Sequence, residues 1–201
     1  MIDNKKQWFE LWFDSPLYHI LYKNRNDEEA HLFIDSILKY LDINAGTVLD
    51  LACGKGRHAH YLAEKKLDVV GLDLSKESIQ YAADTYQLPN LEFYVHDMRL
   101  PFRMNYFNYI FNFFTSLGYF NDLRDNEKVF ESMHAGLKED GYILIDFMNT
   151  EKVINNLVPR ENKQIDGYTF YLRREVENGK ITKHIQVEKG EYLWMYKEEV
   201  Q

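Results

Sequence analysis

The stretch from Asp50 to His58, DLACGKGRH, combines residue types that suit a tight, ligand-accessible turn. Gly54 and Gly56 stand two residues apart. Glycine allows a tight turn and the close approach of a ligand, because it has no Cβ. Asp50 ends the apolar run before them, where its carboxylate can accept from an amine or hold the loop through backbone N–H groups. Because the stretch lies between an expected strand and an expected helix, it predicts a ligand-binding turn.

Side chains that could bind a ligand also stand at the ends of the later apolar runs. Asp73 ends DVVGLD, where a carboxylate can bind both hydroxyls of a ribose. Asp97 and Met98 come at the end of LEFYVHDM, and FNFFTSLGYF, which contains Phe113 and Phe114, follows a fourth run. The carboxyl ends of parallel strands lie at one edge of an open sheet and bind ligands there. These residues are therefore expected at one site.

Alternating strands and helices must position that site. Strands are expected at residues 47–52, 68–73, 91–97, 106–114 and 141–149, and helices at 27–41, 58–66, 75–86 and from 121 or 122 to 137. Ser75 is a good N-cap, with Ser78 in the first turn. Strands separated by helices predict parallel pairing through right-handed crossovers, so the fold class is α/β with a mostly parallel sheet and flanking helices.

The two ends of the chain differ from this alternation. Pro16 interrupts the aromatic-rich residues 5–22, so two short helices are expected there. Strand-like stretches near the C-terminus cover residues 168–176, 180–188 and 191–200, and the hairpin turn signals between them are Asn178–Gly179 and Lys189–Gly190. This end is expected to be an antiparallel meander attached to the parallel sheet, without a core of its own.

Bulk composition narrows the class of protein. The 201 residues suffice for one α/β domain with a full core. A formal charge of −8 disfavours binding to nucleic acid, because an acidic chain repels phosphate. A single cysteine, Cys53, excludes an intrachain disulfide and fits a reducing compartment, so a cytoplasmic location is expected. No apolar run approaches the roughly 20 residues that span a bilayer, so no membrane partner is expected.

The segment VLDLACGKG resembles the nucleotide loop of class I S-adenosylmethionine-dependent methyltransferases. The resemblance runs from about Asp27 to Asn149, and Ala52 stands where many members have their first glycine. It implies a Rossmann-like sheet, S-adenosylmethionine as cofactor and S-adenosylhomocysteine as product. It also implies that Asp97 binds the adenine amino group, while Met98 packs on the ring and its N–H meets a ring nitrogen.

The resemblance extends to the remaining site residues. Family members line the methyl-transfer pocket after strand four, where Phe113, Phe114, Thr115 and Ser116 stand here, and many cover the cofactor with an N-terminal helix that carries a tyrosine. The implied cofactor-binding residues are Asp50, Ala52, Cys53, Gly54, Gly56, Asp73, Leu74, Asp97, Met98, Phe113 and Phe114, with Tyr18 and Tyr22 as lid candidates. Arg57 or Arg25 is a further candidate, for the methionine carboxylate.

The chain is accordingly expected to form a single methyltransferase domain of residues 1–201. Within it, residues 1–26 form an aromatic lid segment, 27–149 the cofactor-binding core and 150–201 the antiparallel extension. Family members usually finish with a helix and an antiparallel strand pair beside strand five, and neither is evident after Asn149. The meander then supplies the edge, or the sequence is truncated and a partner chain covers it, which is compatible with a homodimer.

Three alternatives remain beside this interpretation. GKGRHA from Gly54 to Ala59 also fits a dinucleotide loop, with Asp73 at nearly the spacing of a ribose-binding acid, which would suit an NAD-dependent oxidoreductase. Asp50 and the Asp97–Met98 pair count against that. A zinc site at Cys53 and nearby histidines is disfavoured by their spacing, so no metal is expected. A non-catalytic module that only binds S-adenosylmethionine is the third.

The methyl acceptor is less defined than the cofactor. No Asn-Pro-Pro-Tyr-type motif follows strand four, which disfavours methylation of nucleobases or glutamine amides, so a small-molecule acceptor is expected, with its N, O or C atom undetermined. An amine or hydroxyl acceptor must lose a proton. His19, Tyr22 and Tyr119 are the weak candidates for a base, and the catalytic residue is undetermined.

Overall fold

The computed structural model describes residues 7–23, 27–120, 122–177 and 179–200. The chain divides into two compact units, one of residues 25–147 and one that joins residues 1–24 to residues 148–201.

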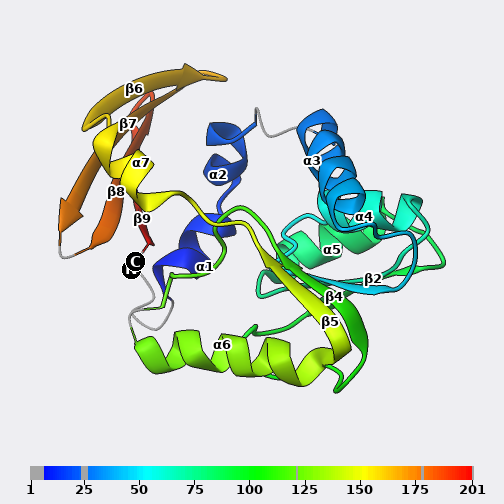
Figure 1. Ribbon diagram of the computed structural model, residues 1–201. Coiled ribbons are helices and arrows are strands. Elements are labelled where there is room, and N and C mark those ends of the chain that lie inside the picture. Colours follow the sequence, from blue (N-terminus) through cyan, green and yellow to red (C-terminus); the bar gives the residue numbers. More distant parts are fainter. Residues whose placement is uncertain (1–6, 24–26, 121, 178, 201) are drawn as a thin grey trace. The chain divides into compact units, whose positions relative to one another are not determined.

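The unit of residues 25–147 is built on a five-stranded parallel sheet of order β3-β2-β1-β4-β5. Its strands are β1 (Thr47–Leu51), β2 (Asp68–Asp73), β3 (Leu91–Val95), β4 (Phe107–Asn112) and β5 (Leu137–Ile145). Strands β4 and β5 run side by side in Figure 1. The predicted α/β fold and its parallel pairing are thus confirmed. The fifth strand begins and ends about four residues before the predicted range, and its pairing with β4 shifts register between Phe107 and Tyr109.

Helices cover both faces of this sheet. They are α3 (Asp27–Tyr40), α4 (Arg57–Glu64), α5 (Lys76–Thr85) and α6 (Leu123–Gly136). Apolar side chains alternate along the strands, so that Val48 packs with Ile34 of α3 and Leu62 of α4, whereas Leu49 packs with Met133 of α6. The period of two along a strand is therefore matched by helices on opposite faces.

Local sequence explains where two of these helices begin. Ser75 Oγ accepts from the N–H of Ser78 at 3.0 Å at the start of α5, which confirms the predicted cap. Asp122 caps α6 by accepting from the N–H of Arg124 at 2.9 Å, so of the two cap candidates, residues 121 and 122, the second is the cap.

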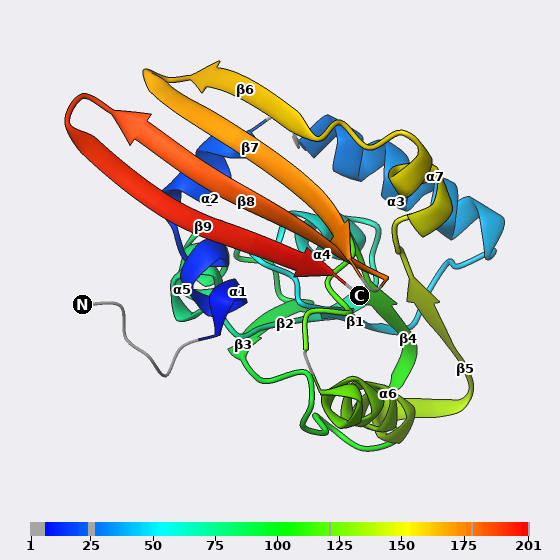
Figure 2. The same cartoon turned by 90° about the vertical axis from the view of Figure 1, so that its left-hand side faces the viewer.

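The other unit contains a four-stranded antiparallel sheet of order β6-β7-β8-β9 (Figure 2). Its strands are β6 (Arg160–Ile165), β7 (Tyr168–Glu177), β8 (Lys180–Lys189) and β9 (Tyr192–Val200), and its helices are α1 (Trp8–Phe13), α2 (Pro16–Leu21) and α7 (Thr150–Asn155). The predicted meander and the two short helices around Pro16 are confirmed. The expectation that the meander is attached to the parallel sheet and supplies its edge was wrong, because in the described part of the chain β6 to β9 pair only with one another and form a separate sheet.

Two elements of this unit were not predicted. A helix does follow Asn149, whose side chain accepts from the N–H of Lys152 at 2.9 Å and so caps α7. Helix α7 has only six residues, too few to show helical periodicity in sequence. Strand β6 escaped prediction because its sequence, RENKQI, is almost entirely polar. It lies at the edge of the meander, where the ladder with β7 holds it.

Buried charge ties the N-terminal helices to the meander. Glu198 of β9 accepts from Trp12 Nε1 at 2.7 Å and from Tyr22 Oη at 2.7 Å. Lys183 of β8 donates to Tyr22 Oη at 2.6 Å and to Glu198 Oε2 at 3.2 Å. Burial lowers the pKa of Lys183, although Glu198 acts to raise it. These contacts join two ends of the chain that are far apart in sequence.

Among the residues that the structure describes, no helix combines the length and the apolar character needed to cross a bilayer.

Candidate functional site

The strand order of the parallel sheet reverses between β1 and β4, and open α/β sheets bind ligands beside the carboxyl ends of the strands at such a switch point. Four polar side chains stand at or just beyond the ends of these strands: Asp50 near the end of β1, Asp73 at the end of β2, Asp97 after β3 and Asn112 at the end of β4. The arrangement brings together the acids that the sequence singled out.

The loop after β1 takes a left-handed path. Ala52, Gly54 and Gly56 have φ angles of +64°, +54° and +80°. Two backbone bonds fix the turn, from Cys53 N to the carbonyl of Leu72 at 2.9 Å and from Gly56 N to the carbonyl of Cys53 at 3.0 Å. The predicted turn is present, and it leads directly into α4.

The two glycines of this loop have different surroundings. A Cβ on Gly56 would lie 2.6 Å from the ring of Phe93 on β3, so this position has no room for a side chain. A Cβ on Gly54 would meet no heavy atom of the described chain within 4 Å. Gly56 therefore serves packing, whereas Gly54 faces open space where a ligand can approach.

Asp73 joins the loop to the second strand. Its Oδ2 accepts from the N–H of Gly54 at 2.8 Å, and its Oδ1 accepts from the N–H of Ser75 at 2.8 Å. A carboxylate offers about four lone-pair positions, so Asp73 can also accept from ligand hydroxyls. The two backbone bonds fix the orientation in which it would do so.

Asp50 is almost completely buried, with 1% of its surface exposed. Burial, together with the charge of Asp73, raises its pKa to about 7, although a bond from the backbone of Ala59 and the charge of Arg57 act to lower it. Its Oδ2 is buried and has no hydrogen-bond partner among the described residues. Such an unmatched acceptor is costly unless a donor is supplied, and an ammonium group would supply one.

Asp97 is held by a residue that the sequence analysis did not single out. Arg99 donates Nε to Oδ1 at 3.0 Å and Nη2 to Oδ2 at 2.6 Å, and its backbone N–H also bonds Oδ1 at 3.0 Å. Partial burial acts to raise the pKa of Asp97, but the bonds from Arg99 outweigh it and hold that pKa below its ordinary value. Asp97 is therefore an oriented, ionised acceptor.

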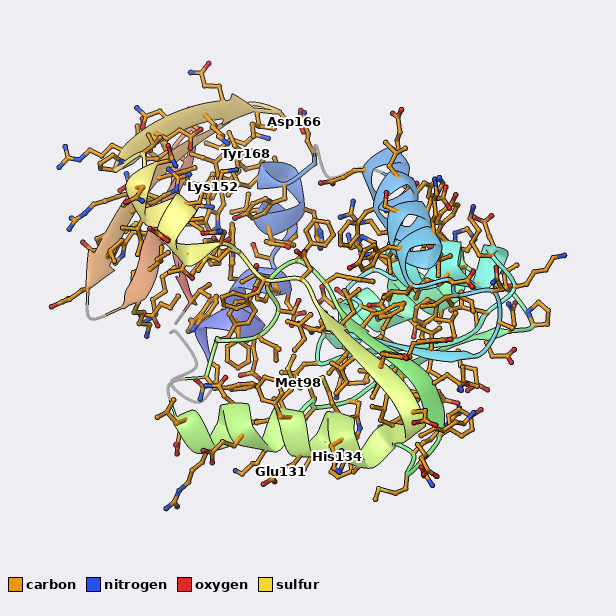
Figure 3. All side chains as sticks on the ribbon, viewed as in Figure 1. Met98, Glu131, His134, Lys152, Asp166 and Tyr168 are labelled. Atoms are coloured by element: carbon orange, nitrogen blue, oxygen red, sulfur yellow. The ribbon has the colours of Figure 1, made fainter. Side chains whose placement is uncertain are left out.

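Apolar side chains stand beside these acids. Leu74, directly after Asp73, is 39% exposed, which is unusual for a leucine at the end of a buried strand. Met98 is half-buried and packs on the apolar cluster between the sheet and α6, the helix that carries the labelled Glu131 and His134 in Figure 3.

The end of β4 has its own polar network. Asn112 is fully buried and donates Nδ2 to the carbonyl of Leu51 at 2.8 Å, while its Oδ1 has no partner among the described residues. Asp146, just beyond β5, accepts from the N–H groups of Phe114 and Thr115 at 3.0 Å each. These bonds hold Phe114 and Thr115 at φ angles of +57° and +55°, a conformation that is strained for residues other than glycine.

Aromatic rings line the side of the switch point that faces α3 and α4. Phe113 is buried, and its ring centroid lies 5.3 Å from that of Phe33 and 5.1 Å from that of His58. The Arg57 guanidinium lies 5.0 Å from the centre of the Phe114 ring and 3.7 Å from a carboxylate oxygen of Glu29.

Cys53 is buried, and the nearby histidines contact neighbouring residues of the same unit. Burial raises the pKa of the Cys53 thiol well above its ordinary value, with the charges of Asp50 and Asp73 acting in the same direction, so it is a poor nucleophile. His60 stacks on Tyr86 at 4.2 Å, and His96 bonds the carbonyl of Leu100 at 2.8 Å. Within the described ranges, no group of three or more His, Cys, Asp and Glu side chains is placed to hold a metal ion.

The sequence model of a family described as a methyltransferase domain matches residues 43–199. The chain belongs to this methyltransferase family. Its fold is also that of a crystal structure of an S-adenosylmethionine-dependent methyltransferase from Clostridium acetobutylicum, with a TM-score of 0.71 at 23% identity, over 92% of this chain and 77% of that one.

Two curated relatives match this chain over only part of their own length. A protein of Invertebrate iridescent virus 6 that is named as a methyltransferase, 235L, is 28% identical over 160 residues, which cover 77% of this chain and 59% of the relative. The dTDP-3-amino-3,4,6-trideoxy-alpha-D-glucopyranose N,N-dimethyltransferase of Streptomyces venezuelae is 26% identical over 135 residues, or 66% of this chain and 56% of the relative. The chain thus spans a little over half the length of each.

Not every predicted site residue of the methyltransferase lies in the unit of residues 25–147. Tyr119 does, whereas Tyr18, His19 and Tyr22 belong to the other unit, at helix α2 and its C-cap. There the Tyr18 ring centroid lies 4.9 Å from that of Tyr22 and 5.2 Å from that of His19. Their assignment as lid or base stays a prediction, and Arg25 lies outside the described residues.

Proposed function

We propose that this methyltransferase domain binds S-adenosylmethionine at the carboxyl ends of β1 to β4 and moves its methyl group to a small-molecule acceptor. The observation that carries the proposal is the bond between Gly54 N–H and Asp73, which presents a glycine loop and an oriented acid side by side at the switch point. Family membership supports the reaction class.

The residues present fit the parts of this cofactor. The buried, unmatched Oδ2 of Asp50 suits the ammonium of the methionine part, and the oriented carboxylate of Asp73 suits the two ribose hydroxyls. The ionised carboxylate of Asp97 suits the adenine amino group. The exposed side chain of Leu74 and the half-buried Met98 are apolar neighbours for the base.

S-adenosylmethionine, when bound, supplies a methyl group on a positively charged sulfur and so a good electrophile. The chain itself must hold the acceptor in line and exclude water, and such alignment contributes up to about 7–11 kcal/mol in favourable cases. The strained turn at Phe114 and Thr115, held by Asp146, is the part of the parallel-sheet unit that we assign to the acceptor side. His19, Tyr22 and Tyr119 are the candidates for a base where the acceptor carries a proton.

A small-molecule acceptor suits this chain better than a nucleic acid. The formal charge of −8 opposes binding to phosphate backbones, and Asn112 is followed by Phe113 rather than by the prolines of an Asn-Pro-Pro-Tyr motif. The Streptomyces venezuelae relative is named for an amino-sugar nucleotide, so that class of acceptor belongs in any test. The single cysteine supports a reducing, cytoplasmic location.

We further propose that residues 27–149 act as the cofactor-binding core. Residues 1–26 would then provide the aromatic lid with Tyr18 and Tyr22, and residues 150–201 the antiparallel extension of one methyltransferase domain. A variant pair tests the lid, since Tyr18→Phe removes only a hydroxyl, whereas Tyr18→Ala also removes the ring. Weaker S-adenosylhomocysteine binding in the second variant alone would support packing of that ring on the cofactor.

Isothermal titration with S-adenosylmethionine, S-adenosylhomocysteine and NAD tests the cofactor. Tight binding of S-adenosylhomocysteine with no heat from NAD is the expected result, and the reverse result would end the methyltransferase proposal. A homocysteine-release assay over amines, hydroxyl compounds and dTDP-amino sugars then tests turnover. Cofactor binding without release for any acceptor class would favour a non-catalytic module.

A further inference from the structure

We propose that Arg99 is the positioning residue that makes the site selective for adenine, by fixing the Asp97 carboxylate as an acceptor. The inference rests on the proposed function, because Asp97 is taken there as the partner of the adenine amino group. The new element is Arg99, which follows Asp97 by two positions and fixes its carboxylate.

The contact between the two side chains is a side-on fork. Nε and Nη2 of Arg99 reach both oxygens of Asp97, at 3.0 Å to Oδ1 and 2.6 Å to Oδ2. Two parallel N–H···O bonds leave a carboxylate little freedom to rotate, and the permanently charged guanidinium keeps it ionised. Oδ1 already accepts from Nε and from the backbone N–H of Arg99, so the position left for a ligand donor is on Oδ2, where the second contact, from Nε at 3.1 Å, is shared with Oδ1.

The same guanidinium is anchored on two other segments. Its Nη1 donates to Oδ2 of Asp125 in the first turn of α6 at 2.7 Å, and Lys128 bonds the other oxygen of Asp125 at 2.8 Å. Its central carbon lies 4.9 Å from the centre of the Phe120 ring, in the segment after β4. Arg99 thus links Asp97 to α6 and to the segment after β4, and it holds the Asp97 carboxylate in place relative to both.

This geometry has a chemical consequence for the base. An ionised, immobile carboxylate accepts from the amino group of adenine but repels the carbonyl oxygen that hypoxanthine carries at the same place. A carboxyl group that takes up a proton can donate to that carbonyl, and a carboxylate that rotates freely holds the amino group less firmly, so either change lowers the discrimination. Selectivity between the two bases therefore depends on Arg99 as well as on Asp97.

The test measures the dissociation constants of S-adenosylhomocysteine and S-inosylhomocysteine, its hypoxanthine analogue, by isothermal titration. The unaltered protein is expected to prefer the adenine compound by at least about 100-fold, as sites built to bond an N–H usually do. Arg99→Met is expected to lower that ratio below about 10-fold, chiefly by weakening the adenine compound. Asp97→Asn should lower it as well, because an amide can donate to the carbonyl.

Arg103→Met is the matched control, since Arg103 also forms an ion pair, with Glu92 at 2.6 Å, but makes no bond to Asp97 among the described contacts. It should keep the ratio of the unaltered protein. Arg99→Lys keeps the charge without the fork and guards against misfolding of the methionine variant. This lysine variant is expected to lower the ratio of the two dissociation constants by at least about 5-fold.

The outcomes separate the two proposals. If the unaltered protein binds neither compound, the proposed function fails and the inference fails with it. If it binds and discriminates, but the Arg99 variants weaken both compounds equally and keep the ratio, Arg99 has only a structural role and the inference alone is overturned.

Discussion

Gly54 and Asp73 are 19 positions apart in sequence, yet the N–H of the first donates to Oδ2 of the second at 2.8 Å. The loop after β1 and the acid that closes β2 are therefore one structural unit. Ser75 N–H bonds the other oxygen, so the start of α5 is tied to the same carboxylate. Changes at Asp73 should consequently affect both the loop and the ligand.

Asp73→Ala is expected to weaken S-adenosylhomocysteine binding by about 1–3 kcal/mol, because the bonds to the ribose and to the loop are lost together. Asp73→Asn should lose less, since its amide oxygen can still accept from one N–H group. Isothermal titration measures both. Asp84→Ala on α5, an exposed acid bonded to Gln80, is the control and should leave the dissociation constant unchanged. An unchanged constant for Asp73→Ala would refute the ribose assignment.

The two loop glycines should respond differently to alanine. Gly56→Ala forces a Cβ to 2.6 Å from Phe93 at a φ of +80°, so it should lower the free energy of unfolding by about 1–3 kcal/mol. Gly54→Ala adds strain at +54° but meets open space, so its main effect should be on ligand affinity. Urea unfolding and titration of the two variants separate these effects.

Ala52 offers the converse change at the same loop. Because its φ is +64°, Ala52→Gly relieves strain and is expected to leave unfolding unchanged or to stabilise by up to about 1 kcal/mol. A clear loss of stability in this variant would contradict the strain assigned to the turn.

Asp50 should make stability depend on pH. Its pKa is about 7 in the folded chain and near 4 when unfolded, so the unfolded chain releases the proton first as pH rises. The Asp50 contribution is therefore most favourable below pH 4, is lost between about pH 4 and 7, and is constant above that range. Asp50→Asn, which resembles the protonated acid, should gain up to about 4 kcal/mol relative to Asp50 across this window.

Urea unfolding of the two proteins at several pH values checks this prediction. Asp97 and Glu161, whose pKa values are lowered by their partners, also make stability depend on pH. Because both proteins contain them, their contribution cancels in the difference between the two unfolding free energies. A difference between the two proteins that does not vary with pH would show that Asp50 is not the titrating group.

Lys183 and Glu198 should be coupled in the stability of the meander. Their side chains are 13% and 18% exposed, and each also bonds Tyr22. Removing one partner leaves a largely buried charge, so Lys183→Met and Glu198→Gln are each expected to cost about 2–4 kcal/mol. The double variant should cost clearly less than the sum of the two, as a double-mutant cycle would measure. Strict additivity would mean that the pair does not interact in solution.

Much of the cofactor side of the molecule is predictable from sequence because the signals are local. The apolar runs that end at Asp50 and Asp73, and the cap at Ser75, depend on residues only a few positions apart. Helix α7 and strand β6 were missed for the same reason, since one is too short to show a period and the other is too polar to suggest a strand. Arg99 follows Asp97 by two positions, but nothing in that spacing shows that its side chain turns back.

The sequence by itself determined the order of strands and helices in residues 27–149 and the identity of the loop, because backbone propensity and apolar period act over short distances. The tertiary structure alone decided that Phe93 fills the space beside Gly56, that Arg99 joins Asp97 to Asp125, and that Glu198 receives Trp12 and Tyr22. Those contacts bring together segments that are distant in the chain, and only the packing of the sheet and its helices determines which side chains meet.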